Sequence, residues 1–367
     1  MNGKKVVFVG KLNLDIGASS SDISGLGDTK DFATGGMGVS LGGASFNVFR
    51  SFRALSDLYG EKYDAVLVTD IGLPPESGEF EGPDQYMFAH FAHNMALDLL
   101  KESGLECVDL SEGRRGAGVA VSLISAWFGG RHIFKQEEPL ASKFNDVSGY
   151  VPPELRAAIH GAALVFLDPA RPWTPATAAA LCEEMGICML TDYGMKEVYE
   201  GTQRTAVERI LGHADIIVVP GDAVVPGMQN GVKDPDRLFK MLCSNSYRAG
   251  TVIMSDGTQP VQLLDDGQVQ QIDVVPVDNP INVSGIGDTR DGALMFFLVN
   301  GDDREVALRK AMEVAALRIQ YPGEEWTEHF LDHVKNNPLF AKDIEAIRLA
   351  TGREENVHVD LQVFDTG

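Results

Sequence analysis

The chain has 367 residues, of which 44% are hydrophobic, which is enough for one large α/β domain with or without a smaller appended unit. Its 31 basic and 53 acidic residues give a formal net charge of −22, which repels nucleic acid and anionic membranes, so we expect neither as a partner. The four cysteines show no C-x-x-C spacing, the N-terminus lacks a signal-peptide pattern, and no apolar run reaches the length of a bilayer span. We therefore expect a soluble cytoplasmic protein.

A buried strand is predicted at residues 6–10, where β-branched and aromatic residues run without interruption to Gly10. Asn13 and Asp15 follow two residues apart, so on a continuing strand they share one face. Polar side chains that leave the C-terminal end of a buried strand lie where open α/β sheets bind ligands. The same spacing also fits a pair of residues that only closes a turn.

Glycines dominate residues 35–43, and a helix-like stretch begins directly after them at residue 44. Asn47 lies on the first turn of that helix, beside the Gly42-Gly43 pair. There its amide can offer both a donor and an acceptor to a polyol or a ribose. The pattern fits equally well a glycine-rich loop followed by an asparagine that satisfies backbone groups.

Strand-like and helix-like runs alternate through the middle of the chain. The strand-like runs, several with the polar residues that close them, cover residues 65–69, 162–167, 189–194, 216–222 and 252–257. Helix-like stretches separate the later ones at 174–184, 204–211 and 235–244. Such alternation with polar strand ends predicts a parallel, doubly wound sheet. Two further runs, 118–125 and 131–135, flank a Gly-Gly pair and predict a hairpin.

The stretch from Gly285 to Asp288 stands between a β-rich run at residues 272–277 and an apolar, helix-like run at 293–299. Its glycines let backbone N–H groups turn toward one point. A helix that begins just after such a turn aims its free N–H groups and its positive dipole end at the same point, which makes an anion site. An acid placed there fits the role of accepting a proton from a hydroxyl that attacks phosphorus. An ordinary glycine turn with Asp288 as the N-cap fits the stretch equally well.

Three motifs, in this order, resemble the ribokinase-like (PfkB) family of sugar and nucleoside kinases. They are Val9-Gly10-x-x-Asn13-x-Asp15, then Gly42-Gly43-x-x-x-Asn47, then Gly285-x-Gly287-Asp288. The resemblance covers roughly residues 5 to 325. It implies a three-layer α/β/α fold with a doubly wound, mostly parallel sheet and a small β lid, whose strands would fall within about residues 11–45 and 114–136.

The resemblance also implies ATP-dependent phosphorylation of a sugar or nucleoside alcohol. By position, Asp288 would be the base, and the backbone around Gly285, Ile286 and Gly287 would hold phosphate. Substrate hydroxyls would contact Asn13, Asp15, Gly42, Gly43 and Asn47, with Asp168 as a further contact. Ser255 and Gly257 would face the nucleotide. Mg²⁺ would accompany ATP, held mainly by ATP oxygens and waters, and a homodimer formed through the lid is the family's habit.

The nucleotide side departs from the family pattern. The family's Asn-x-x-Glu motif, tied to Mg²⁺ and phosphate, is replaced by residues 221–224, in which only Asp222 offers a carboxylate to a metal-bound water. Pro260 removes a backbone N–H from the loop that opens at Ser255. Arg290 and Asp291 replace apolar or small residues just after the proposed base. For Arg290 we expect either a phosphate contact or a pair with Asp291.

Residues 1–325 are predicted to form the kinase domain, and 326–367 a C-terminal helical extension with a polar tail. The sequence favours a kinase, and the alternative is a catalytically impaired sugar- or nucleoside-binding relative, motivated by the missing Asn-x-x-Glu and by Pro260. A dinucleotide oxidoreductase requires Gly-x-Gly-x-x-Gly after the first strand, where this chain has Asn13 and Asp15. The sequence identifies neither the substrate nor the oligomeric state.

Overall fold

The computed structural model describes most of the chain in separate stretches. They are residues 4–18, 37–69, 71, 83–103, 106–110, 120–125, 132–135, 151–170, 173–194, 201–223, 234–244, 247–277, 285–321 and 325–351. The predicted Gly-Gly turn at 129–130, the tail after residue 351 and the side chain of Asp15 lie outside the described residues. No helix in the described part of the chain has both the length and the apolar character needed to cross a membrane.

The centre of the fold is a sheet with the strand order β13-β12-β11-β10-β9-β8-β1-β4-β5. Its strands are β1 (Lys5–Val9), β4 (Asp64–Thr69), β5 (Cys107–Asp109), β8 (Ala162–Leu167), β9 (Cys188–Asp192), β10 (Ile216–Pro220), β11 (Thr251–Ser255), β12 (Val261–Asp265) and β13 (Gln268–Ile272). Neighbours from β5 through β11 pair in parallel, whereas β12 and β13 are antiparallel. The predicted mostly parallel, doubly wound sheet is confirmed.

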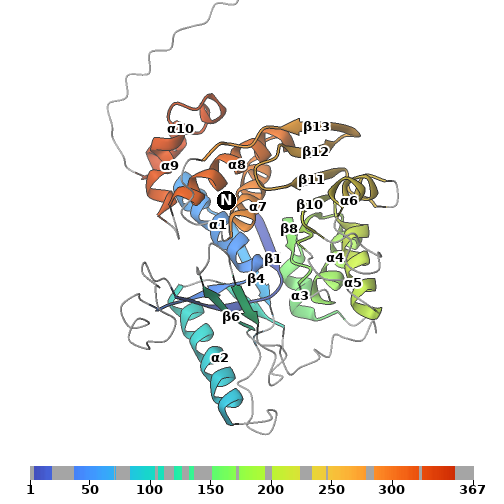
Figure 1. Ribbon diagram of the computed structural model, residues 1–367, viewed down its shortest axis with the longest axis vertical. Coiled ribbons are helices and arrows are strands. Elements are labelled where there is room, and N and C mark those ends of the chain that lie inside the picture. Colours follow the sequence, from blue (N-terminus) through green and yellow to red (C-terminus); the bar gives the residue numbers. More distant parts are fainter. Residues whose placement is uncertain are drawn as a thin grey trace, which may run out of the picture.

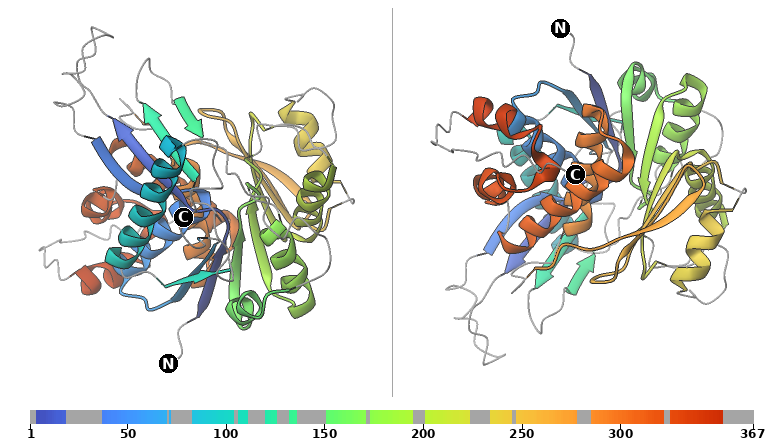
Figure 2. Two further views of the ribbon diagram at one scale, coloured as in Figure 1. Left: turned by 90° about the horizontal axis from the view of Figure 1, so that it is seen from below. Right: turned by 90° about the horizontal axis from the view of Figure 1, so that it is seen from above.

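Helices cover both faces of this sheet, as Figures 1 and 2 show. The helices are α1 (Ala44–Tyr59), α2 (Pro83–Ser103), α3 (Pro153–Ile159), α4 (Trp173–Met185), α5 (Gly201–His213), α6 (Pro235–Leu242), α7 (Ile286–Asn300), α8 (Arg304–Gln320), α9 (Trp326–Val334) and α10 (Ile344–Thr351). Alternate residues of a strand point to opposite faces. In β1, Val6 and Phe8 therefore join the core under α1, α7 and α8, while Val7 and Val9 join the core under α3 and α4. Fully apolar strands arise because both faces are buried.

A second, smaller sheet has the order β3-β2-β6-β7. Its strands are β2 (Asn13–Ala18), β3 (Met37–Gly42), β6 (Ala120–Ser125) and β7 (His132–Lys135). The chain enters β2 only three residues after β1 ends, so this sheet extends from the carboxyl end of the central strands. Helix α2 packs against it. The small β-sheet beside the main sheet was predicted from the family resemblance and is present.

The antiparallel edge of the main sheet was missed from the sequence. The β-rich run predicted at 272–277 is wrong, since β13 ends at Ile272 and residues 273–277 form no strand. The β12–β13 hairpin turns at Asp266 and Gly267, both with positive φ (48° and 77°). An Asp-Gly pair between two strand-like runs is a strong hairpin signal, and it would have found this turn.

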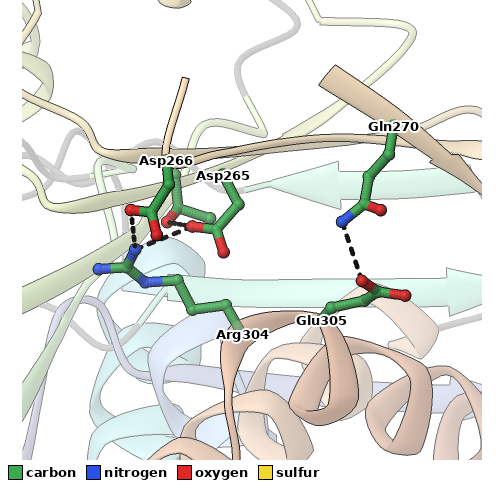
Figure 3. Close-up of polar contacts among 6 residues, drawn as sticks. Asp265, Asp266, Gln270, Arg304 and Glu305 are labelled. Atoms are coloured by element: carbon green, nitrogen blue, oxygen red, sulfur yellow. Dashed lines mark hydrogen bonds and ion pairs between the residues drawn. The ribbon is translucent and has the colours of Figure 1, made fainter. Parts of the chain in front are cut away.

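Polar contacts tie helix α8 to this hairpin (Figure 3). The guanidinium of Arg304 pairs with Asp265 at 2.8 Å and with Asp266 at 3.5 Å. One residue further along α8, the Glu305 carboxylate accepts a hydrogen bond of 3.1 Å from the Gln270 side chain. Because these contacts are accessible to solvent, they orient the helix against the sheet edge rather than adding much free energy.

Helices α1 and α7 approach each other so closely that their backbones nearly touch. A Cβ built on Gly292 would lie 2.4 Å from the carbonyl oxygen of Val48 and 3.0 Å from the nitrogen of Phe52. Around this point Phe8, Phe49, Phe52 and Phe296 pack edge to face. The first turns of both helices are thereby held side by side at the carboxyl edge of the sheet.

We expect Gly292→Ala to lower the free energy of unfolding by about 1–3 kcal/mol, because the added methyl group can fit only if two backbones separate. Chemical denaturation of the purified protein measures the change. The matched control is Gly212→Ala in α5, where an added Cβ meets nothing within 4 Å. Alanine there should be neutral or stabilising, since glycine weakens a helix. Equal stability of the two variants would contradict the close approach.

Candidate active site

The first turn of α7 forms the predicted anion loop. Gly285 is its N-cap, in the left-handed region with φ 72° and ψ 14°. The helix closes its first turn with a 2.9 Å hydrogen bond from the Thr289 nitrogen to the Gly285 carbonyl. The N–H groups of a first turn have no partner inside their own helix, so those of Ile286 and Gly287 are available to an anion. Gly285 through Asp288 are only half-buried, so this loop is accessible.

The Asp288 carboxylate lies against the first turn of α1. The side-chain amide of Asn47 donates a 2.8 Å hydrogen bond to Asp288 Oδ2, across 241 positions of sequence. Asn47 itself is fixed by its backbone nitrogen, which donates to the Gly43 carbonyl at 2.9 Å. The structure thus brings together two residues that the sequence analysis assigned to opposite sides of one reaction centre. An amide that donates to a carboxylate also fixes which oxygen remains for another partner.

Gly42 and Gly43 carry the chain from the small sheet into α1. Gly42 ends β3 and pairs in register with Asn13 of β2. Gly43 has φ 97°, and a Cβ there would lie 2.4 Å from the Lys11 carbonyl oxygen. Only glycine meets both requirements, so the pair lets α1 begin beside the link between β1 and β2. The side-chain oxygen of Asn13 is buried, with no hydrogen-bond partner among the described residues.

Asp168 closes β8 and is buried at the same edge. Its Oδ1 accepts a 2.9 Å hydrogen bond from the Ala170 nitrogen, while Oδ2 has no partner within the described part of the chain. Burial raises the pKa of the Asp168 carboxyl, against the lowering effect of the backbone hydrogen bond from Ala170. A Cβ on Gly10 would lie 2.5 Å from the Asp168 Cβ, so Gly10 is what allows this approach.

The residues predicted to face the nucleotide and its metal ion differ in their burial and contacts. Ser255 ends β11, and its hydroxyl accepts a 2.6 Å hydrogen bond from Arg290 Nη1. Gly257 follows in an exposed turn with φ 55°. Asp222 follows β10 and is half-buried. Within the described residues, no three His, Cys, Asp or Glu side chains gather as a metal cluster would.

Sequence reasoning missed a buried ionic cluster just behind Asp288. Arg290 does pair with Asp291, at 2.8 Å, but both side chains are buried: 8% of Arg290 and 0% of Asp291 is exposed. Asp192, at the end of β9, joins them, and burial followed by the nearby Asp291 carboxylate raises its pKa well above the usual range. Two charged residues replacing small ones on a first helical turn were the available signal. The involvement of Asp192 depends on tertiary packing.

Together, a doubly wound sheet, a small second sheet, and an acid on a glycine-capped helix N-terminus define a phosphotransferase-like α/β scaffold. Comparison of the sequence with family models assigns the chain to a narrower class. A family model described as pfkB family carbohydrate kinase matches residues 94–326, well over half of the 367 residues. The chain belongs to the PfkB family. The matched region includes the α7 loop but begins after Asn13 and Asn47.

Solved structures with the same fold include both sugar and nucleoside kinases. A ribokinase of Arabidopsis thaliana, complexed with ribose and ATP, is 17% identical with a TM-score of 0.61, covering 91% of this chain and 99% of its own. A ribokinase described as putative, from Agrobacterium tumefaciens, is 16% identical with a TM-score of 0.65, covering 96% and 100%. An adenosine kinase of Schistosoma mansoni, in complex with 2-fluoroadenosine, is 12% identical with a TM-score of 0.63, covering 88% and 97%. The comparison with curated proteins gave no match.

Proposed function

We propose that this protein transfers the γ-phosphoryl group of ATP to an alcohol group of a sugar or nucleoside. The observation that carries the proposal is the 2.8 Å hydrogen bond between Asn47 and Asp288. It joins a polar group on the small-sheet side to an acid on a helix N-terminus that can hold phosphate. Membership of the PfkB family supports the reaction class.

The acceptor side is suited to hydroxyl groups. Asn13 and Asp168 each carry a buried oxygen without a partner among the described residues. A buried acceptor left unpaired is costly, and a substrate hydroxyl can donate to it. Both oxygens belong to residues at the carboxyl ends of adjacent strands, or just beyond them, where open α/β sheets bind ligands. The structural relatives solved with ribose or 2-fluoroadenosine are consistent with a polyol acceptor.

The donor side is suited to a triphosphate. The N-terminus of α7, capped by Gly285, offers backbone N–H groups and the positive end of the helix dipole. ATP is present in the ribokinase structure from Arabidopsis thaliana. Mg²⁺ would be held mainly through phosphate oxygens and water, with Asp222 the carboxylate best placed by sequence to contact it. Such an ion would neutralise phosphate charge.

In the proposed reaction, the acceptor hydroxyl gives its proton to Asp288. Its oxygen forms a bond to the γ-phosphorus, and the bond from that phosphorus to the β-phosphate oxygen breaks, so that ADP leaves with the electron pair. The Asn47 amide holds the carboxylate in place throughout. Backbone N–H groups of the α7 first turn stabilise charge on the transferred group.

A sugar- or nucleoside-binding protein without kinase activity is the second candidate. The observation that favours it is the departure on the donor side: the Asn-x-x-Glu side chains are missing, and the Ser255 hydroxyl is engaged by Arg290.

A coupled assay of ADP release over a panel of sugars and nucleosides, with ATP and Mg²⁺, tests the choice. Alcohol-dependent ADP release is the expected result. Sugar binding by calorimetry without any ATP binding would favour the second candidate.

A further inference from the structure

Arg290 links the anion loop, Gly285 to Asp288, to the end of strand β11. It lies on the first turn of α7, two residues after Asp288. Its Nε donates to Asp291 Oδ1 at 2.8 Å, and its Nη2 forms an ion pair with the same oxygen at 2.8 Å. Its Nη1 donates to Ser255 Oγ at 2.6 Å. One side chain therefore ties the start of α7 to the end of β11. A Cβ on Gly287 would lie 4.0 Å from Arg290 Nη2, so the guanidinium lies directly beneath the loop.

The negative charges around this guanidinium exceed its single positive charge unless one of the neighbouring carboxyl groups keeps its proton. Three carboxylates face it: Asp288 and Asp291 from its own helix, and Asp192 from β9. The carboxyl groups of Asp192 and Asp291 are close enough to share a hydrogen bond. Asp192 Oδ1 and Asp291 Oδ2 are buried and receive no hydrogen bond from another group among the described residues. Two carboxyl groups in contact cannot both be ionised at low cost, and the raised pKa of Asp192 indicates that it keeps its proton. Arg290 then cancels the charge of Asp291.

Asp288, which accepts a hydrogen bond from Asn47, is the third carboxylate near the guanidinium. The pKa of Arg290 is raised: burial by itself would lower it, but the neighbouring carboxylates, Asp291 above all, outweigh burial. If the guanidinium were absent, a second negative charge would lie under a loop that must accept a triphosphate. A lysine could supply the charge but not the planar set of donors that reaches Asp291 and Ser255 together.

We propose that Arg290 is a positioning residue of the phosphate site, which holds the anion loop against β11 and neutralises the buried Asp291 so that the loop can accept a triphosphate. The inference rests on the proposed kinase function. It extends that function by assigning a role to a residue where the chain departs from its family. The charge pair Arg290–Asp291 then replaces an apolar first turn without disturbing the anion site.

The test compares Arg290→Gln with the double variant Arg290→Gln/Asp291→Asn. We expect Arg290→Gln to weaken ATP binding in calorimetry by about 10- to 100-fold, the range for coupled charged neighbours, and to change alcohol binding by less than about threefold. The double variant should recover most of the ATP affinity, because it removes the charge that the first substitution left uncompensated. The matched control is Arg309→Gln, on an exposed helical pair with Glu305.

A pH profile provides a readout that a purely structural role would not change. The groups near Asp288 include Asn47 of α1, which is neutral, Asp192 of β9, and Arg290 and Asp291 of its own helix. Without the guanidinium, the negative Asp291 favours the protonated form of Asp288, so the acid limb of kcat/KM should move to higher pH. In the double variant it should return toward the parent position.

The outcomes separate this inference from the function on which it rests. If the parent protein binds no ATP, the kinase proposal fails and Arg290 loses its role with it. If the parent binds ATP but Arg290→Gln binds it equally well, or the double variant shows no recovery, the inference alone is overturned. Should Arg290→Gln not fold, Arg290→Lys replaces it: partial ATP affinity with an unshifted acid limb supports the role of charge, and unchanged affinity contradicts the role of the planar donors.

Discussion

Replacing Asp288 by asparagine should lower kcat by about 10²- to 10⁴-fold, the usual contribution of a positioned general base. Asparagine has the same shape, but its amide cannot accept the proton of the attacking hydroxyl. The first turn of α7 should survive, because its cap is the Gly285 backbone and not the Asp288 side chain. ATP and the acceptor should therefore still bind. Steady-state kinetics together with calorimetry separate turnover from binding.

The control for this variant is Asp332→Asn, an exposed acid on α9 paired with Lys335 and far in sequence from the site. It should retain the parent kcat. Turnover of Asp288→Asn within a few fold of the parent would remove Asp288 from the role of base. Loss of ATP binding along with turnover would instead mean that the carboxylate shapes the anion loop.

The second large effect is expected for Lys310→Ala, on stability. Lys310 of α8 has a side chain only 4% exposed, and its ammonium group pairs with Asp302 and with Asp343 at 2.7 Å each. It also lies 5.1 Å above the centre of the Phe297 ring. Removing one partner from a buried ion pair leaves uncompensated charge, so the free energy of unfolding should fall by about 3–5 kcal/mol. Denaturant unfolding monitored by circular dichroism measures this.

The comparison variant is Lys335→Ala, whose exposed pair with Asp332 is the ordinary surface case. It should change stability by less than about 1 kcal/mol. A similarly small effect for Lys310→Ala would show that hydration of the Asp302 and Asp343 carboxylates compensates for the lost ion pairs. Lys310→Met, which keeps most of the side-chain volume, distinguishes loss of charge from loss of packing.

The reason for this sensitivity lies in how the C-terminal helices attach. Trp326, Phe330, Phe340 and Ile347, which follow the predicted domain boundary at 325, belong to the same buried cluster as the core of α1 and α7. Asp343 stands just before α10, so Lys310 pins this segment to α8. The boundary itself stays a prediction, but the helices beyond it share one continuous core with the helices before it.

The sequence predicted the parts of the fold that local patterns determine. Continuous apolar runs predicted the buried strands of the main sheet, such as β8 and β10. The glycine turns at Gly43 and Gly285 could be predicted because each has a backbone requirement that is visible locally, such as φ 97° at Gly43, whereas the role of Asp288 stays a prediction. The β12–β13 edge was missed, although the Asp-Gly pair at 266–267 is a local signal of its turn.

The ionic cluster around Arg290 shows a feature that local sequence patterns do not predict. Arg290 and Asp291 are adjacent charged residues, and on most helices such a pair lies in solvent. Here helix α7 is buried on nearly all sides, which turns the pair inward toward Ser255 and Asp192. Which charges a fold buries depends on residues tens to hundreds of positions away, so local reasoning could propose the pairing of Arg290 with Asp291 but not its environment.

The near-contact of backbones at Gly292 lies one helical turn beyond Asp288, opposite Val48, the residue after Asn47. The distance between Asp288 and Asn47 is thus set by main-chain atoms, which have no alternative rotamers. Mutational drift in the outer layers can erode the tolerance of the protein to heat and leave this spacing untouched. Substitutions in the outer layers can therefore change stability without changing the spacing between Asn47 and Asp288.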